Sequence, residues 1–330
     1  MKSFKYSVAK EPTGAARTVS ANPTAKFLAG GTNLVDLMKE YVERPSEVVD
    51  VSRLNLAQIR ETSNGISIGA LAKNSDTANH PLVRQNYPLL SMAILAGASA
   101  QLRNMATNGG NLMQRTRCQY FYDTAMPCNK REPGSGCGAL EGLNRIHAIL
   151  GHSENCVATY PGDMANALYA LDATIRVRGT NGRDRLIPVQ DFHRLPGDTP
   201  QKDNNLAHGE LIVAIEIPRN NFAAKSYYLK VRDRASYAFA LVSVAAALEM
   251  RGDAIERARV VLGSVAHKPW RSVEAERVLI GKPVTVETFE ASAEAALKDA
   301  KPLEHNGYKV ELGKRSIVLA LQRAMSGEVA

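Results

Sequence analysis

Hydrophobic and polar residues alternate along this chain in short blocks that predict both strands and helices. Near the amino terminus an apolar strand at 26–29, an amphipathic helix at 33–42 and a strand at 47–51 read as a βαβ unit. The helix is indicated by Leu34, Leu37, Met38 and Tyr41 at helical spacing. Further strands are expected at 66–70, 173–177 and 210–218, and further helices at 88–102 and 165–171.

The pattern changes from about residue 222. We expect a strand at 228–232, a long apolar strand or buried element at 238–250, and a strand at 257–263. Helices are expected at 273–280, 286–299 and 308–325. The sequence therefore predicts an α+β fold with two domains, at residues 1–221 and 222–330.

Composition and charge narrow the class of protein. The 45% hydrophobic and 22% charged content is typical of a globular domain, and no apolar run reaches the length of a membrane span. The amino-terminal residues lack a secretory signal and a twin-arginine pair. The net charge is +8, but lysine and arginine are scattered along the chain. This distribution argues against nucleic-acid binding and favours a solvated surface or an acidic partner subunit.

All four cysteines lie in one 39-residue stretch, at Cys118, Cys128, Cys137 and Cys156. Four thiolates are the right number for a tetrahedral metal site or an iron–sulfur cluster. Gaps of nine, eight and eighteen residues contain no CxxC pair, so the spacing alone does not identify the metal. Two disulfides or free thiols are the alternatives. The segment is rich in glycine and proline, and the run 129–131 carries two basic residues that would offset negative charge.

Two Gly-Gly turns are the other chemical signal. Residues 29–34 read Ala-Gly-Gly-Thr-Asn-Leu between a strand and a helix, and residues 107–111 read Thr-Asn-Gly-Gly-Asn. Glycines let backbone N–H groups approach a ligand closely, and a helix amino terminus favours an anion. One such turn is more often a chain reversal, but two of them indicate a shared phosphate cradle. Neither a GxGxxG nor a P-loop motif is present.

These two turns resemble the FAD-binding signatures of the flavoprotein subunit of molybdenum hydroxylases, the xanthine dehydrogenase family. The similarity extends over essentially the whole chain, including Glu210–Pro218 and the terminal segment from Gly307. The cysteine segment, at about 115–157, resembles the [4Fe–4S] insertion of the FAD subunit of bacterial periplasmic aldehyde oxidoreductases. The segments 231–238 and 265–271 resemble the same subfamily.

The resemblance implies a two-lobed FAD-binding domain of the vanillyl-alcohol-oxidase (PCMH) type, followed by a CO dehydrogenase flavoprotein-like domain. It places the FAD pyrophosphate on Lys26, Phe27, Leu28, Ala29, Gly30, Gly31, Thr32, Asn33 and Leu34, and on Thr107, Gly110 and Asn111. Asp163 would bind the flavin's sugar chain, and Leu211 (or Ile212) and Lys230 would approach the isoalloxazine. From the residues alone, Asp163 also fits a helix cap and Lys230 a surface strand position. The resemblance assigns a [4Fe–4S] cluster to the four cysteines.

The function implied by the resemblance is electron transfer. The chain would act in a heterotrimer with a large molybdenum-cofactor subunit and a small [2Fe–2S] subunit, passing electrons to FAD and an external acceptor. No residue here is expected to oxidise the substrate. A periplasmic location is expected, reached as a passenger on a partner's twin-arginine signal, with the cytoplasm as the alternative. Three other functions compete with this one. The chain could be the FAD subunit of a xanthine dehydrogenase-like hydroxylase, a stand-alone flavin oxidoreductase, or a non-catalytic scaffold in which the cluster serves only to hold the loop in place.

Overall fold

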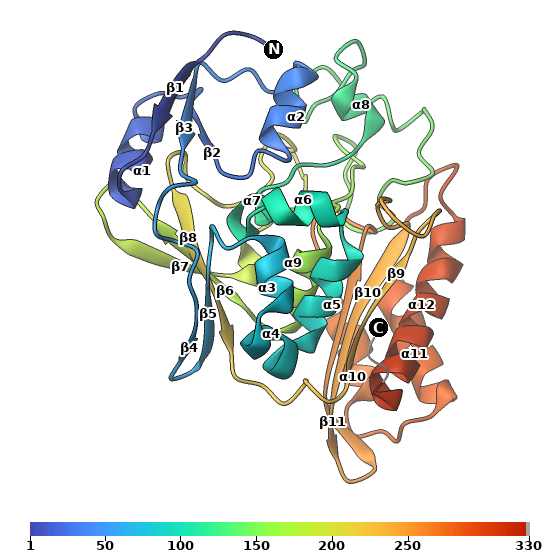
Figure 1. Ribbon diagram of the computed structural model, residues 1–330. Coiled ribbons are helices and arrows are strands. Elements are labelled where there is room, and N and C mark those ends of the chain that lie inside the picture. Colours follow the sequence, from blue (N-terminus) through green and yellow to red (C-terminus); the bar gives the residue numbers. More distant parts are fainter. Residues whose placement is uncertain (328–330) are drawn as a thin grey trace.

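The computed structural model describes residues 1–327 and shows three β-sheets with helices packed around them (Figure 1). The amino-terminal sheet is parallel, with the order β1-β3-β2. It contains β1 (Lys5–Val8), β2 (Lys26–Leu28) and β3 (Glu47–Asp50), with α1 (Pro12–Ser20) and α2 (Leu34–Lys39) connecting them. Helix α1 was not expected, because its buried side chains are mostly small: Ala15, Ala16 and Val19.

The second sheet has five antiparallel strands in the order β4-β5-β8-β6-β7. These strands are β4 (Ile59–Thr62), β5 (Gly65–Gly69), β6 (Thr174–Arg178), β7 (Asp184–Pro188) and β8 (Leu211–Pro218). The helices of this lobe are α3 (Asn74–Asn79), α4 (Pro81–Asn86), α5 (Pro88–Ala96), α6 (Ala100–Met105), α7 (Asn108–Leu112), α9 (Asp163–Ala170) and the 3₁₀ turn η1 (Val189–Asp191).

The carboxy-terminal part is an antiparallel sheet covered by helices. Its strands are ordered β12-β11-β10-β9: β9 (Ser226–Val231), β10 (Val242–Arg251), β11 (Ala254–Gly263) and β12 (Trp270–Arg271). Helices α10 (Val273–Leu279), α11 (Val286–Leu297) and α12 (Tyr308–Ser326) pack together on one side of this sheet (Figure 1). Helices α5 and α9 of the preceding lobe also contact its strands.

A continuous apolar core joins the antiparallel lobe to the carboxy-terminal sheet. Tyr169 and Phe192 share this core with Tyr228, Ala245 and Val261, and all five are buried. The two parts of the chain on either side of residue 222 therefore bury apolar surface against each other.

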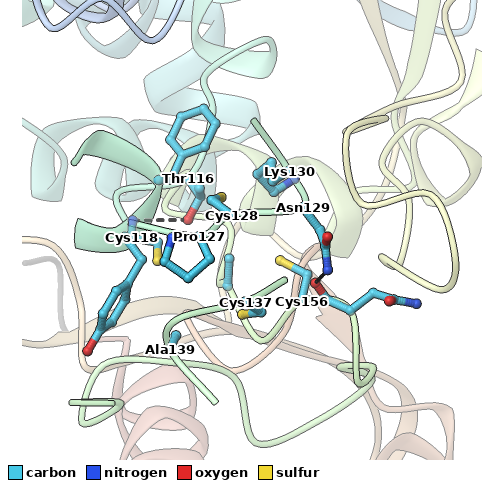
Figure 2. A pocket seen from close by; sticks show the side chains of 13 residues that line it. Thr116, Cys118, Pro127, Cys128, Asn129, Lys130, Cys137, Ala139 and Cys156 are labelled. Atoms are coloured by element: carbon cyan, nitrogen blue, oxygen red, sulfur yellow. Dashed lines mark hydrogen bonds between the residues drawn. The ribbon is translucent and has the colours of Figure 1, made fainter. Parts of the chain in front are cut away.

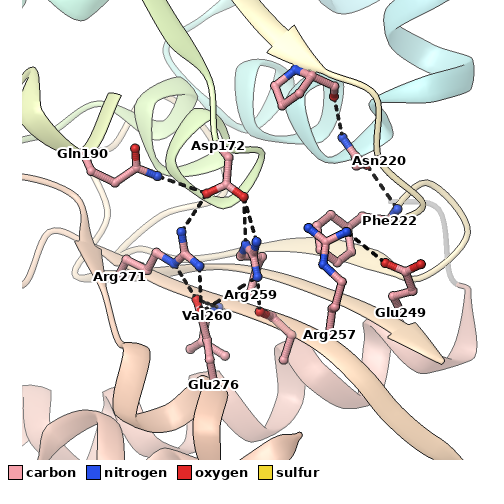
Figure 3. A network of polar contacts seen from close by, with 12 residues as sticks. Asp172, Gln190, Asn220, Phe222, Glu249, Arg257, Arg259, Val260, Arg271 and Glu276 are labelled. Atoms are coloured by element: carbon pink, nitrogen blue, oxygen red, sulfur yellow. Dashed lines mark hydrogen bonds and ion pairs between the residues drawn. The ribbon is translucent and has the colours of Figure 1, made fainter. Parts of the chain in front are cut away.

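A polar network spans the same junction (Figure 3). Asp172, in the turn after α9, forms ion pairs of 2.7 Å with both Arg259 of β11 and Arg271 of β12. Arg271 in turn pairs with Glu276 of α10 at 2.8 Å. One carboxylate thus ties the antiparallel lobe to two strands of the carboxy-terminal sheet.

The α+β fold class is confirmed, but three expected elements differ. The helix expected at 88–102 is two helices, because Gly97 is extended, Ala98 has a φ of 53° and Ser99 caps α6. The second glycine turn is the short helix α7, capped by Thr107. The apolar strand expected from residue 238 begins at Val242. Within residues 1–327, none of the helices has both the length and the apolar character needed to cross a bilayer.

Candidate functional site

The first glycine turn presents free backbone donors. It connects β2 to α2, and Gly31 has a φ of 74°, which favours glycine. The backbone N–H groups of residues 31–34 have no acceptor among the described residues. The side-chain nitrogen of Asn33 is also buried, and it has no hydrogen-bond partner within residues 1–327. Since buried polar groups are normally paired, this turn has donors to offer an anionic ligand.

The two glycine turns lie against each other. A Cβ at Gly30 would lie 2.1 Å from the carbonyl oxygen of Met105, just before the second turn. Lys73 also donates to that carbonyl at 3.0 Å. The structure therefore brings both turns to one place, and the absence of a side chain at Gly30 is what allows their close approach.

The second turn differs chemically from the first. The N–H groups of residues 108–111 all have acceptors within the chain; for example, Gly110 donates to Thr107 Oγ1 at 3.2 Å. The Asn111 side chain donates to Asn74 at 2.9 Å. We had expected backbone donors at both turns, and only the first has them free.

Asp163 and Lys230 form a buried ion pair. Lys230 Nζ lies 2.8 Å from Asp163 Oδ2, and their side chains are only 4% and 10% exposed. Tyr228 donates to the other oxygen of Asp163 at 2.7 Å, and Lys230 also donates to the Ala96 carbonyl. Asp163 is the first residue of α9 but makes no capping hydrogen bond. The helix-cap and surface-strand interpretations of these two residues are therefore wrong.

The remaining predicted contacts are spread over neighbouring elements. Leu211 is buried in the core between α1 and the amino-terminal sheet, whereas Ile212 lies beneath the second turn, next to Gly109. Lys26 is exposed and pairs with Glu43 at 3.6 Å. Ile212 thus lies against the second turn, whereas Leu211 belongs to the apolar cluster against which Phe27 and Ala29 of the first turn's segment pack.

The cysteine segment has little regular structure, apart from the short helix α8 (Gln119–Tyr122). Hydrogen bonds from its own polar side chains fix the conformation of the segment. Arg131 donates to the carbonyls of Tyr120, Phe121 and Met126, and Asn129 accepts from the N–H groups of Gly134 and Gly136. Arg131 was expected to offset cluster charge, but its guanidinium is engaged in fixing the loop.

The four cysteines line one small cavity, with their sulfur atoms around a common space (Figure 2). The cavity volume is about 10 Å³, and the four thiols are free. Within residues 1–327, no three His, Cys, Asp or Glu side chains converge closely enough to hold a single metal ion. Four cysteine thiols are a donor set that suits either a [4Fe–4S] cluster or a tetrahedral zinc ion.

Burial changes the chemistry of these thiols. It raises the pKa of Cys118 to about 12 and that of Cys156 to about 11. Both thiols are therefore protonated at neutral pH unless a cation stabilises the thiolate. Iron binding would displace these protons, as metal binding to cysteine does generally.

A buried ionic network lies between the glycine turn and the cysteine cavity. Arg115 pairs with Glu43 and Asp203, each at 2.7 Å, and its N–H donates to Asn33 in the first turn. Lys130, which lines the cavity, is 2% exposed and pairs with Asp203. Burial alone would raise the pKa of Asp203, but Arg115 and Lys130 outweigh it and hold that pKa well below its usual range.

Helix α2 connects the first glycine turn to the cysteine segment. Leu37 is buried in the same apolar cluster as Cys118 and Cys128. On the same helix, Asp36 pairs with Arg117 at 2.8 Å and accepts from Tyr122. The helix that begins at the first glycine turn therefore packs against the cysteine segment.

Comparison with known families decides the class. Residues 2–220 match the family described as "FAD binding domain in molybdopterin dehydrogenase", and residues 227–325 match "CO dehydrogenase flavoprotein C-terminal domain". The chain belongs to the FAD-binding subunits of molybdenum hydroxylases. It is thus an oxidoreductase subunit, as expected.

Individual relatives agree with this family. The chain is 50% identical over 326 residues to the aldehyde oxidoreductase FAD-binding subunit PaoB of Escherichia coli, covering 98% of this chain and 99% of that protein. It is 29% identical to the glyceraldehyde dehydrogenase medium chain of Sulfolobus acidocaldarius, covering 99% and 98%. Among solved structures, carbon monoxide dehydrogenase from Hydrogenophaga pseudoflava matches with a TM-score of 0.77 and 25% identity, covering 98% of each chain.

The described residues fit the family's cofactor. The unpaired Asn33 amide and the free N–H groups of residues 31–34 suit a pyrophosphate, and the exposed side chains of Met105 and Met113 adjoin the two turns. Sequence reasoning missed Arg115 and Asp203, which link the turn to the cysteines. Arg115 stands at the start of the segment 115–157 but carried no predicted role, and Asp203 had no local signal at all.

Proposed function

We propose that this chain is the electron-transferring FAD subunit of a molybdenum-dependent aldehyde oxidoreductase. The observation that carries the proposal is the 50% identity, over nearly the full length of both chains, to an aldehyde oxidoreductase FAD-binding subunit. The relatives named for carbon monoxide, nicotinate or xanthine are 28% identical or less. The aldehyde class is therefore favoured over the xanthine class.

In this proposal FAD binds where the two glycine turns meet. Lys26 to Leu34 would hold the pyrophosphate with backbone donors, while Thr107, Gly110 and Asn111 would form the opposite wall. The Asp163–Lys230 pair would meet the rest of the cofactor, with Lys230 supplying positive charge for a reduced flavin. The flavin supplies the electron-exchange chemistry, and the chain sets its position and electrostatics.

The same proposal assigns a [4Fe–4S] cluster to Cys118, Cys128, Cys137 and Cys156. The support is the shared cavity, the four free thiols and the buried cation of Lys130 beside them. Arg131, Asn129 and the glycines at 134 and 136 would keep the ligands in place. When bound by these residues, such a cluster would supply one-electron redox chemistry.

The proposed partners are a large molybdenum-cofactor subunit and a small [2Fe–2S] subunit. Several relatives carry names that describe them as a medium chain or as one subunit of a complex, which supports an assembly of this kind. The net charge of +8 suits acidic partner surfaces.

We expect the complex to reach the periplasm on a partner's twin-arginine signal. Cell fractionation with and without that leader tests the location, and a chain that stays cytoplasmic with the leader intact contradicts it.

The experiment that tests the proposal compares the purified chain with the co-expressed complex. We expect about one FAD and about four iron and four sulfide per chain, with aldehyde-dependent dye reduction only in the complex. Cys156→Ser should lose the iron, whereas the exposed neighbour Glu154→Ala should keep it. One zinc per chain, or paired disulfides by mass spectrometry, contradicts the cluster. Aldehyde oxidation by the lone chain contradicts the electron-transfer role and favours a stand-alone flavin oxidoreductase.

A further inference from the structure

His147 is a buried histidine that faces a cysteine of the cavity. It lies in the loop that follows the third cysteine, and only 1% of its surface is exposed. Its Nε2 is 3.1 Å from Cys118 Sγ. Its imidazole also lies near the ring of Tyr120, with 6.2 Å between the centroids. No part of the proposed FAD site contacts this side chain.

The position of His147 is fixed by residues distant in the sequence. Its backbone N–H donates to the Asn144 carbonyl at 3.1 Å. Its own carbonyl accepts from Asn306 at 3.2 Å and from Lys309 Nζ at 3.0 Å. Lys309 belongs to α12 and is fully buried, and it also donates to the carbonyls of Ile146 and Ser264. The carboxy-terminal domain therefore fixes the backbone of His147, from which the imidazole reaches Cys118.

The hydrogen-bonding pattern identifies the nitrogen that carries the proton. His147 Nδ1 is buried and has no hydrogen-bond partner among the described residues. A proton there would be an unsatisfied buried donor and would leave the Nε2 lone pair facing the sulfur, which is unfavourable with a thiolate. A proton on Nε2 instead points at Cys118 Sγ.

We propose that His147 is a positioning and tuning residue that donates a hydrogen bond from Nε2 to the Cys118 thiolate and raises the reduction potential of the cluster. The inference rests on the proposed cluster. Reduction adds one electron and breaks no bond, so the negative charge on the sulfurs increases. A hydrogen bond to sulfur stabilises the more negative, reduced form, and such bonds are among the factors that set cluster potentials.

The test is a redox titration of the cluster followed by EPR, on the purified complex, for the wild type and three variants. His147→Leu removes the donor, and His147→Gln keeps an amide donor of similar reach. His152→Leu is the control, because His152 is half-buried, does not line the cavity, and among the described residues its side chain bonds only to the Lys301 carbonyl. At the wild-type midpoint potential, we expect His147→Leu to show a reduced-to-oxidised ratio about tenfold lower, equivalent to 59 mV for one electron. His147→Gln and His152→Leu should stay within threefold of the wild type.

Equal midpoints for His147→Leu and His152→Leu overturn the inference while leaving the cluster in place. A wild-type complex without iron overturns both the inference and the cluster proposal, so the two failures are distinguishable. A second measurement needs no substitution. Pulsed EPR of the reduced wild-type cluster with ¹⁵N-labelled histidine should show a nitrogen coupling and a proton that exchanges in D₂O, and their absence overturns the hydrogen bond.

Discussion

Replacing Gly30 with alanine would place a methyl carbon 2.1 Å from the Met105 carbonyl oxygen and 2.8 Å from its carbon. Cβ atoms essentially never come within 3.0 Å of another heavy atom, and here the neighbour is backbone rather than a movable side chain. The two glycine turns must therefore separate by about 1 Å. Hydrogen bonds weaken steeply when their geometry is distorted. A ligand held by both turns cannot keep its contacts to each.

The expected result is weaker FAD binding. Hydrogen bonds to charged groups contribute about 1.5 to 3 kcal/mol each, and 1.4 kcal/mol is a tenfold change in Kd. Losing one such bond to the pyrophosphate therefore raises the Kd roughly 10- to 100-fold. The assay is fluorescence titration of the flavin-free complex with FAD, with Gly307→Ala as control. A Cβ at Gly307 would meet no atom within 4 Å, and its φ of −55° suits alanine. An unchanged Kd for Gly30→Ala refutes the reasoning.

Three further predictions concern buried charge. Asp203→Asn leaves the buried Lys130 without its carboxylate and Arg115 with only Glu43, so we expect about 3 kcal/mol of destabilisation in urea unfolding, and no loss refutes the network's role. Burial lowers the pKa of His193 and His267 to about 4 each. Unfolding lets both bind protons below about pH 6.5, so stability should fall by roughly 1 kcal/mol per pH unit for each histidine between pH 6 and 4.5. A flat urea midpoint over that range contradicts this. Lys230→Met removes positive charge near the proposed flavin, so we expect a lower flavin midpoint potential, measured by spectroelectrochemistry. An unchanged midpoint potential would count against a position of Lys230 beside the flavin.

Local patterns predicted the elements whose side chains repeat regularly. Strand β8 and helices α11 and α12 were expected within about two residues of their observed bounds, because apolar periodicity defines them. The expected helix at 88–102 was too long, because the left-handed Ala98 gives no sequence signal. The candidate cysteines and the first glycine turn were predicted from their local positions in the sequence. Asp203 and His147 were not, since their importance comes from contacts with residues 88 and 29 positions away.

The ion pairs of Asp172 with two arginines of the carboxy-terminal sheet have a consequence for protein engineering. Together with the shared core, they join the segments on either side of residue 222 through apolar and ionic contacts, so we expect the two segments to unfold together. Exchanging the carboxy-terminal domain with that of a distant relative would leave the half-buried Asp172 without an ion-pair partner, unless the new domain also carried arginines at the positions of Arg259 and Arg271. Substituting the FAD subunits of different hydroxylases for one another therefore requires whole chains, or chimeras in which this contact surface is exchanged as a set.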